Sequence, residues 1–327
     1  MDSPCGKRGK TLEKRTPEEE MEYRRYLRKR IRMRKRRRQV MIARTIVAVV
    51  GLVFVFLIFY GIGKLTDPLF AGKSDPQMTK EPEVTPFTVD VPEGYEDVYD
   101  KLYAMREDYS GIDDILLNLK QYPEALLNLL AGNPETLEFV SGYLMHMDDE
   151  KANGEITQEE LDELTPPLFL QWDKRWGYVK YGGNIIAING CGPTCMSMVY
   201  TGLTKDLSKS PAEIADFCIE NDYYADDSGT SWSLMSEGAK KLGLNAEKIG
   251  IGQQAIQEKL ESGCLVICSM APGDFTDTGH FIVLRGMTKK GKFLINDPNS
   301  QSRSQKKWEA ETVLKQVKAA WAYSYTQ

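Results

Sequence analysis

The amino-acid sequence predicts an α+β domain with an antiparallel sheet, preceded by an N-terminal transmembrane helix and a small helical subdomain. Three observations lead to this prediction. Residues 165–327 begin with helical apolar periodicity and end mostly in strand-like runs. Residues 45–63 carry no charged side chain and are rich in Val, Ile, Leu and Phe. Residues 95–147 repeat apolar side chains at spacings of three and four.

The C-terminal domain, residues 165–327, is long enough to bury one core of its own. Its helices come first and its strands mostly last, which favours an α+β order over alternating βα units. We expect helices at 191–203, 211–220, 231–242, 254–262 and 309–319, and strands at 265–269, 280–287, 293–296 and 321–325.

The N-terminal part of the chain has the charge pattern of a membrane anchor. Residues 1–44 hold 17 Lys/Arg and 6 Asp/Glu, and the remaining residues have a net charge of −16. A helix over 45–64 is long enough to cross the hydrocarbon core. Because the basic run 24–38 lies just before it, the positive-inside rule predicts a cytoplasmic tail (1–44) and an exported C-terminal part. The expected location is the cell membrane, with one span and an extracellular catalytic domain.

Two alternatives compete with this anchor. In a cleaved signal peptide, the basic region would exceed forty residues, and residues 69–71 offer no small-x-small cleavage site. Nucleic acid is the other partner that a basic run can have. The adjacent apolar span favours membrane lipid, bound through residues 24–64, and we predict no nucleic-acid partner.

Between anchor and C-terminal domain we expect two segments. Residues 65–92 contain five prolines and are typical of an extended tether. Residues 93–164 are predicted to form the helical subdomain and an acidic connector. Within the connector, Asp149–Glu160 aligns with a calcium loop, but Lys151 occupies a ligand position. The alternative is a turn followed by a helix that Thr157 and Glu160 close as a capping box.

A cysteine and a histidine of the C-terminal domain have the setting of a thiol nucleophile and its base. Cys191 lies in Gly190-Cys191-Gly192-Pro193-Thr194, at the start of a predicted helix whose N-terminus favours a thiolate. His280, at the start of a predicted strand, is the one histidine of this domain. Each residue also has an ordinary explanation, as a buried structural thiol and as a core histidine.

Two further residues could complete such a site. Asp297, in Asn296-Asp297-Pro298, could orient the imidazole, or it could merely form a turn. Gln171 could donate its amide N–H to an oxyanion, or it could be a surface glutamine between two tryptophans. Cys195, one helical turn after Cys191, is expected in the helix core. No cofactor is expected, and the absence of a CxxC pair disfavours zinc.

These motifs together resemble the C39-like cysteine peptidase family, in its stand-alone branch without a transporter. The matching pieces, in order, are Gln171-Trp172-Asp173-Lys174-Arg175-Trp176, Gly190-Cys191-Gly192-Pro193-Thr194, Gly279-His280-Phe281-Ile282-Val283-Leu284 and Asn296-Asp297-Pro298. The resemblance implies a papain-like fold with Cys191 as nucleophile, His280 as base, Asp297 as orienting acid and Gln171 in the oxyanion hole. In transporter-fused relatives the glutamine lies only a few residues before the cysteine, whereas here twenty residues separate them.

The sequence therefore predicts a membrane-anchored, exported cysteine peptidase whose substrate is a peptide or a peptidoglycan stem. Two other functions remain open. One is an acyltransferase or amidase with the same site and a different acceptor. The other is a catalytically idle domain that binds the cell wall or a protein, for which three catalytic side chains would be unnecessary.

Overall fold

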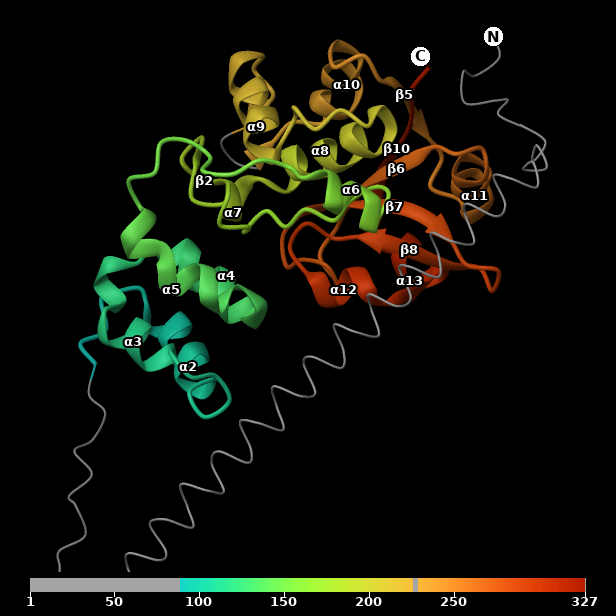
Figure 1. Cartoon of the computed structure of the whole chain (residues 1–327). Coiled ribbons are helices and arrows are strands. Elements are labelled where there is room, and N and C mark those ends of the chain that lie inside the picture. The colour runs from blue at the N-terminus through green and yellow to red at the C-terminus, as the bar shows by residue number, and fades with distance from the viewer. Residues whose placement is uncertain (1–88, 226–228, 327) are drawn as a thin grey trace, which may run out of the picture. The chain divides into compact units, whose positions relative to one another are not determined.

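The structure, a computed structural model, describes residues 89–225 and 229–326 (Figure 1). The basic tail, the predicted transmembrane helix at 45–64 and the tether up to residue 88 lie outside the described residues, so these three predictions stay predictions. Among the helices that the structure does describe, none is both long enough and apolar enough to cross a membrane.

The helical subdomain has the short helices that the sequence predicts. Pro123 immediately precedes one α-helix and Pro134 begins a 3₁₀ turn, because proline suits the first positions of a helix. Buried apolar side chains of the four α-helices, among them Leu102, Leu126 and Phe139, form a small core. The elements are α2 (Glu96–Ala104), α3 (Ile112–Leu117), η1 (Leu119–Gln121), α4 (Glu124–Gly132), η2 (Pro134–Thr136) and α5 (Leu137–His146).

The acidic connector forms the capped helix α6 (Gln158–Glu163). The Thr157 hydroxyl accepts from the Glu160 N–H, and the Glu160 carboxylate accepts from the Thr157 N–H at 2.8 Å. The predicted capping box is therefore confirmed. In the calcium-loop alignment, Asp149 and Glu160 hold the first and last ligand positions. Both carboxylates have other partners here: Asp149 contacts His146 at 2.9 Å, and Glu160 forms an ion pair with Arg175 at 2.7 Å.

The C-terminal domain is built on a six-stranded sheet in the order β5-β10-β6-β7-β8-β9. Every neighbouring pair is antiparallel, which confirms the predicted sheet type. The strands of this sheet are β5 (Asn245–Ile249), β6 (Leu265–Met270), β7 (His280–Met287), β8 (Lys292–Asn296), β9 (Lys307–Glu309) and β10 (Val317–Ser324). Two hairpins lie outside it: β1 (Lys180–Tyr181) pairs with β2 (Asn184–Ile185), and β3 (Tyr224–Ala225) pairs with β4 (Gly229–Thr230).

Helices cover both faces of this sheet, so its central strands are buried on both sides (Figure 1). Successive side chains of a strand point to opposite faces. The helices are α7 (Ile186–Asn189), α8 (Cys191–Thr204), α9 (Pro211–Glu220), α10 (Ala239–Lys241), α11 (Gln253–Glu261), α12 (Gln301–Gln305) and α13 (Ala310–Leu314). In β6, Leu265 and Ile267 join the core beneath α8 and α9, while Val266 and Cys268 join the core beneath α11 and α13.

Two predicted helices were wrong in part. The segment 309–319 ends its helix at Leu314 and enters β10 at Val317, because β10 pairs with strands on both sides. The segment 231–242 contains a π-helical turn, η3 (Leu234–Gly238), before the short α10. The other predicted helices and strands of the C-terminal domain agree with the structure within about two residues, apart from the last strand, which begins earlier than predicted.

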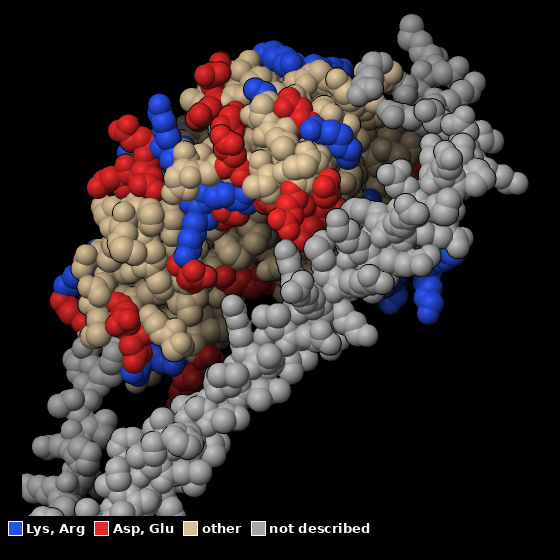
Figure 2. Space-filling view, in the orientation of Figure 1, with Lys and Arg blue, Asp and Glu red and all other residues tan. Residues whose placement is uncertain are grey.

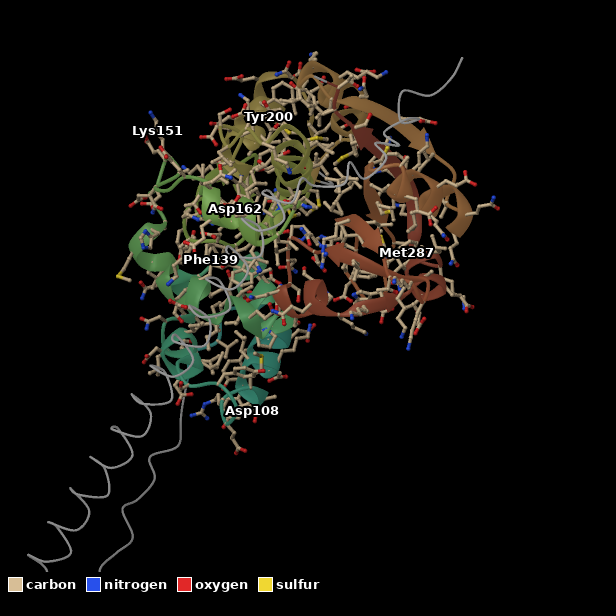
Figure 3. All side chains as sticks on the ribbon, turned by 45° about the vertical axis from the view of Figure 1, so that its right-hand side comes forward. Asp108, Phe139, Lys151, Asp162, Tyr200 and Met287 are labelled. Atoms are coloured by element: carbon tan, nitrogen blue, oxygen red, sulfur yellow. The ribbon has the colours of Figure 1, made fainter. Side chains whose placement is uncertain are left out.

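The helical subdomain packs against the C-terminal domain through Tyr178. Its ring stacks on Phe139 of α5 at 4.1 Å between centroids and on His146 at 4.7 Å. The Tyr178 hydroxyl donates to the Phe139 carbonyl at 2.8 Å. Figure 3 labels Phe139 where the helices of the subdomain meet the rest of the described chain. The two parts therefore share a buried aromatic contact.

The surface of the described chain continues the acidic excess of the sequence. In the view of Figure 2, acidic side chains gather in several patches with basic side chains between them. Exposed ion pairs join acidic and basic side chains on the described surface, such as Lys174 with Glu138 at 2.6 Å. Such exposed pairs contribute little to stability individually.

Candidate active site

Cys191 is the first residue of α8, at a tight junction with the short α7. The glycines on either side of it permit close packing. A Cβ on Gly190 would lie 2.5 Å from Ile186, and one on Gly192 would lie 2.7 Å from the Thr230 side chain. These glycines let the helix that begins at Cys191 start between α7 and β4.

His280 and Asp297 meet because of the sheet topology. His280 begins β7, and Asp297 directly follows β8, its antiparallel neighbour. The start of one strand and the end of the next therefore lie at the same edge of the sheet. The Nε2 atom of His280 is 2.7 Å from Oδ1 of Asp297, which leaves Nδ1 of the ring for another partner. His280 is 8% exposed and Asp297 is 0% exposed.

The protonated imidazole is stabilised in this setting. Burial by itself lowers the pKa of His280, but the charge and hydrogen bond of Asp297 outweigh it. Interaction with the Cys191 thiol adds to the rise, and the pKa of His280 reaches about 9. Burial raises the pKa of Asp297, yet His280 and then Arg303 bring it below the ordinary value. An imidazolium paired with a carboxylate is thus the favoured state at neutral pH.

Arg303 is a partner of Asp297 that the sequence reading missed. Its Nε atom donates to Oδ2 of Asp297 at 2.6 Å, while the Asn299 N–H donates to Oδ1 at 2.8 Å. With His280, these donors satisfy both carboxylate oxygens. The one sequence signal was a basic residue shortly after Asp297, in a stretch that otherwise reads as a polar turn.

The thiol and the imidazole open into one cleft of about 660 Å³. A half-exposed tryptophan, Trp232, and a lysine, Lys318, also line it. A cleft of this volume lies in the range of ligand-binding sites. Its lining residues are Ile188, Asn189, Cys191, Ala225, Gly229, Thr230, Ser231, Trp232, Ser269, Met270, Thr278, Gly279, His280, Phe281 and Lys318.

Gln171 lies beside the site rather than in the lining of the cleft. Its backbone N–H donates to the Pro298 carbonyl at 2.7 Å. Its side-chain Nε2 donates to the carbonyl of Ala187 at 2.6 Å and has a longer contact, 3.5 Å, with that of Ile188. One amide N–H is therefore committed to α7, and the other is held only weakly. The oxyanion role of Gln171 stays a prediction.

The other free thiols of the described residues are buried. Cys195, Cys218 and Cys268 lie in the two cores, and burial raises the pKa of each. The expected core position of Cys195 is confirmed. Within residues 89–225 and 229–326, no group of three or more His, Cys, Asp and Glu side chains could hold a metal ion.

A thiol at a helix N-terminus, beside a histidine that a buried aspartate orients, is the arrangement that thiol-dependent acyl transfer requires. Residues 163–327 match the Peptidase_C39 like family, and this match covers half of the chain. The chain therefore belongs to that family, which confirms the resemblance seen in the sequence motifs. No curated protein matches the chain.

Proposed function

We propose that the protein is a cysteine peptidase that cleaves peptide or amide bonds through Cys191, His280 and Asp297. The observation that carries the proposal is the 2.7 Å contact between Nε2 of His280 and the buried Asp297 carboxylate, beside a thiol that opens into the same cleft. Membership of the Peptidase_C39 like family supports it.

The chemistry follows from these positions. The imidazolium of His280 favours a thiolate at Cys191, which attacks the carbonyl carbon to form a C–S bond. The carbonyl oxygen becomes an oxyanion, for which the N–H at the start of α8 and the second amide N–H of Gln171 are the proposed donors. The C–N bond then breaks, and the leaving amine takes the proton of His280.

The second half of the reaction regenerates the thiol. His280, now neutral, takes a proton from water, and the hydroxide attacks the thioester carbon. The C–S bond breaks, the acid product leaves, and Cys191 is again a thiolate beside an imidazolium. Asp297 keeps the imidazole oriented and does not take the proton itself.

Alkylation of the purified full-length protein tests the nucleophile. At neutral pH we expect iodoacetamide to modify Cys191 much faster than Cys195, Cys218 or Cys268, because these three are buried with raised pKa values. Peptide mass spectrometry gives the four rates. Equal rates in the folded protein would remove Cys191 from the proposed role.

Turnover of a peptide library, including peptidoglycan stem peptides, tests the whole set. Cys191→Ala and His280→Ala should each abolish turnover, and the double variant should be little worse than either alone. Asp297→Asn should keep partial activity. Turnover at the wild-type rate by Cys191→Ala would favour an idle binding domain. Products formed with added amines would identify an acyltransferase.

We also propose that residues 45–64 anchor this peptidase to the cell membrane, with the basic run 24–38 on the cytoplasmic side. The uncharged span and the change from a basic tail to an acidic remainder support this placement. The substrate is then an exported peptide or a peptide stem of the cell wall.

A further inference from the structure

Two side chains of the helical subdomain reach the segment that carries the orienting aspartate. Asn133, just before η2, donates from Nδ2 to the carbonyl of Asn299 at 2.5 Å. Glu135, within η2, contacts the beginning of α12. Asn299 and α12 directly follow Asp297 in the chain. The subdomain thus contacts the peptidase domain next to the catalytic acid as well as at Tyr178.

Glu135 accepts four hydrogen bonds from this segment. Its Oε1 accepts from the Ser300 hydroxyl at 2.7 Å, the Ser302 hydroxyl at 2.5 Å and the Ser302 N–H at 3.2 Å, and its Oε2 accepts from the Gln301 N–H at 2.7 Å. Two of these bonds satisfy the N–H groups of Gln301 and Ser302 in the first turn of α12, and the Ser300 hydroxyl accepts from the third, that of Arg303. The four bonds to Glu135 also lower its pKa against the opposing effect of burial, so it is an anion at neutral pH.

Residues farther along α12 contact Asp297 itself. Arg303 of α12 donates to Oδ2 of Asp297 at 2.6 Å. The Ser304 hydroxyl accepts from the Asp297 N–H at 2.8 Å and donates to the Ser300 carbonyl at 2.7 Å. Through Arg303 and Ser304, α12 thus contacts both the carboxylate and the backbone of Asp297, while Glu135 contacts the start of the same helix.

We propose that Glu135 is a positioning residue for catalysis: through α12 and Arg303 it holds Asp297 against His280, so the helical subdomain is part of the catalytic apparatus. This inference rests on the proposed thiol peptidase function. Three consecutive hydrogen-bonded connections link Glu135 to the imidazole: Glu135 to the start of α12, Arg303 to Asp297, and Asp297 to His280. A residue that acts through such a network changes a rate by about threefold to tenfold.

Loss of this positioning should appear in the rate at which Cys191 reacts. The titratable and charged groups around His280 are Asp297 and Cys191, with Arg303 behind Asp297 and Lys318 in the same cleft. A displaced Asp297 supports the imidazolium less well, so His280 loses its proton at a lower pH and assists the Cys191 thiol less. At pH 10, where His280 is deprotonated in wild type and variant alike, the two proteins should react at the same rate.

The experiment measures the rate at which iodoacetamide alkylates Cys191 in the full-length protein from pH 5 to pH 10. We expect Glu135→Gln to slow alkylation by about threefold to tenfold near pH 6 and to leave the rate near pH 10 unchanged. Glu138→Gln is the matched control. It removes the exposed ion pair between Glu138 and Lys174, which also joins the two parts and does not involve α12.

The outcomes separate this inference from the proposed function. If wild-type Cys191 has the pH profile of an ordinary thiol, the proposed function fails and the inference fails with it. If wild type shows the acid-side reactivity and Glu135→Gln matches Glu138→Gln, the inference alone is wrong. Should Glu135→Gln lose its folded circular dichroism spectrum, Ser302→Ala decides. It removes one hydroxyl donor to Glu135 and should shift the profile in the same direction.

Discussion

At the scale of single residues, the two oxygens of Asp297 have separate tasks. Oδ1 accepts from His280, and Oδ2 accepts from Arg303 at 2.6 Å. Because a buried carboxylate with both oxygens satisfied remains ionised, Asp297 can orient the imidazole and stabilise its positive charge without taking its proton. Of these two partnerships, only the one with His280 was expected from the sequence.

The raised pKa of His280 predicts how stability depends on pH. The effect is best measured in Cys191→Ala, where the thiol no longer contributes to the pKa of His280. There the folded state still binds the imidazole proton more tightly than the unfolded state does. The stabilisation is complete below about pH 6.5 and is lost as pH rises through the folded-state pKa, which is about 9 with the thiol present.

Thermal denaturation between pH 6 and pH 9.5 checks this. We expect the Tm of Cys191→Ala to fall as pH rises through that window. The double variant Cys191→Ala with His280→Gln should show a flatter profile. Parallel profiles for the two proteins would contradict the raised pKa.

A second prediction for single residues concerns which side chain donates to the oxyanion. Gln171→Ala should lower kcat by about 10²–10³ with little change in KM, which is the usual result of losing one donor. The comparison is Asn189→Ala. Asn189 lines the cleft two residues before the nucleophile, and its Nδ2 has only 3.5 Å contacts with Tyr181 and Tyr224. A larger loss of kcat for Asn189→Ala would transfer the role to Asn189.

At the scale of elements, the sequence predicts best where local signals set the ends. The helix α9 has the predicted bounds because Ser210 and Glu213 form a capping box and Pro211 occupies the first turn. The edge strand β5, by contrast, was missed because its polar side chains Glu247 and Lys248 are exposed and no apolar alternation marks it. Its strand character comes from pairing with β10.

The site residues also divide into those that local sequence signals mark and those that they do not. Cys191, His280 and Asp297 were found because each lies in a recognisable local motif. Arg303 and Glu135 lie in ordinary polar sequence, and Glu135 contacts residues more than 160 positions away. Their importance comes from tertiary contacts, which no local pattern in one sequence reports.

At this scale we predict how the stability of the connector around α6 responds to a mutation of its cap and to added calcium. Thr157→Ala removes the hydroxyl that accepts from Glu160, and we expect a loss of about 1 kcal/mol in the free energy of unfolding. Calcium should leave the Tm unchanged, because the end carboxylates are engaged by His146 and Arg175. Urea denaturation measures the free energy of unfolding, and thermal denaturation with and without calcium measures the Tm. A rise in Tm with calcium would restore the binding-loop interpretation.

At the scale of the whole molecule, the catalytic domain is one part of a chain with strongly divided charge. Residues 1–44 are basic, and the remainder has a net charge of −16. Such a division is typical of a protein whose basic end faces the anionic cytoplasmic leaflet. The helical subdomain comes between this end and the peptidase domain, and it contacts the peptidase domain both at Tyr178 and beside Asp297. In the proposed arrangement, the helical subdomain lies between the membrane anchor and the peptidase domain and contacts the latter beside Asp297.

The orientation of this chain is the last prediction. With a tag at the N-terminus, protease added to intact cells should digest residues after about 65 and leave the tag protected, because the basic run keeps the tail inside. A membrane-impermeant maleimide should label wild-type protein on intact cells and should label Cys191→Ala far less. In permeabilised cells both ends should be digested. A soluble form in the medium that lacks residues 1–64 would instead identify a cleaved signal peptide. Protection of the catalytic domain in intact cells would reverse the orientation and exclude cell-wall stems as substrates.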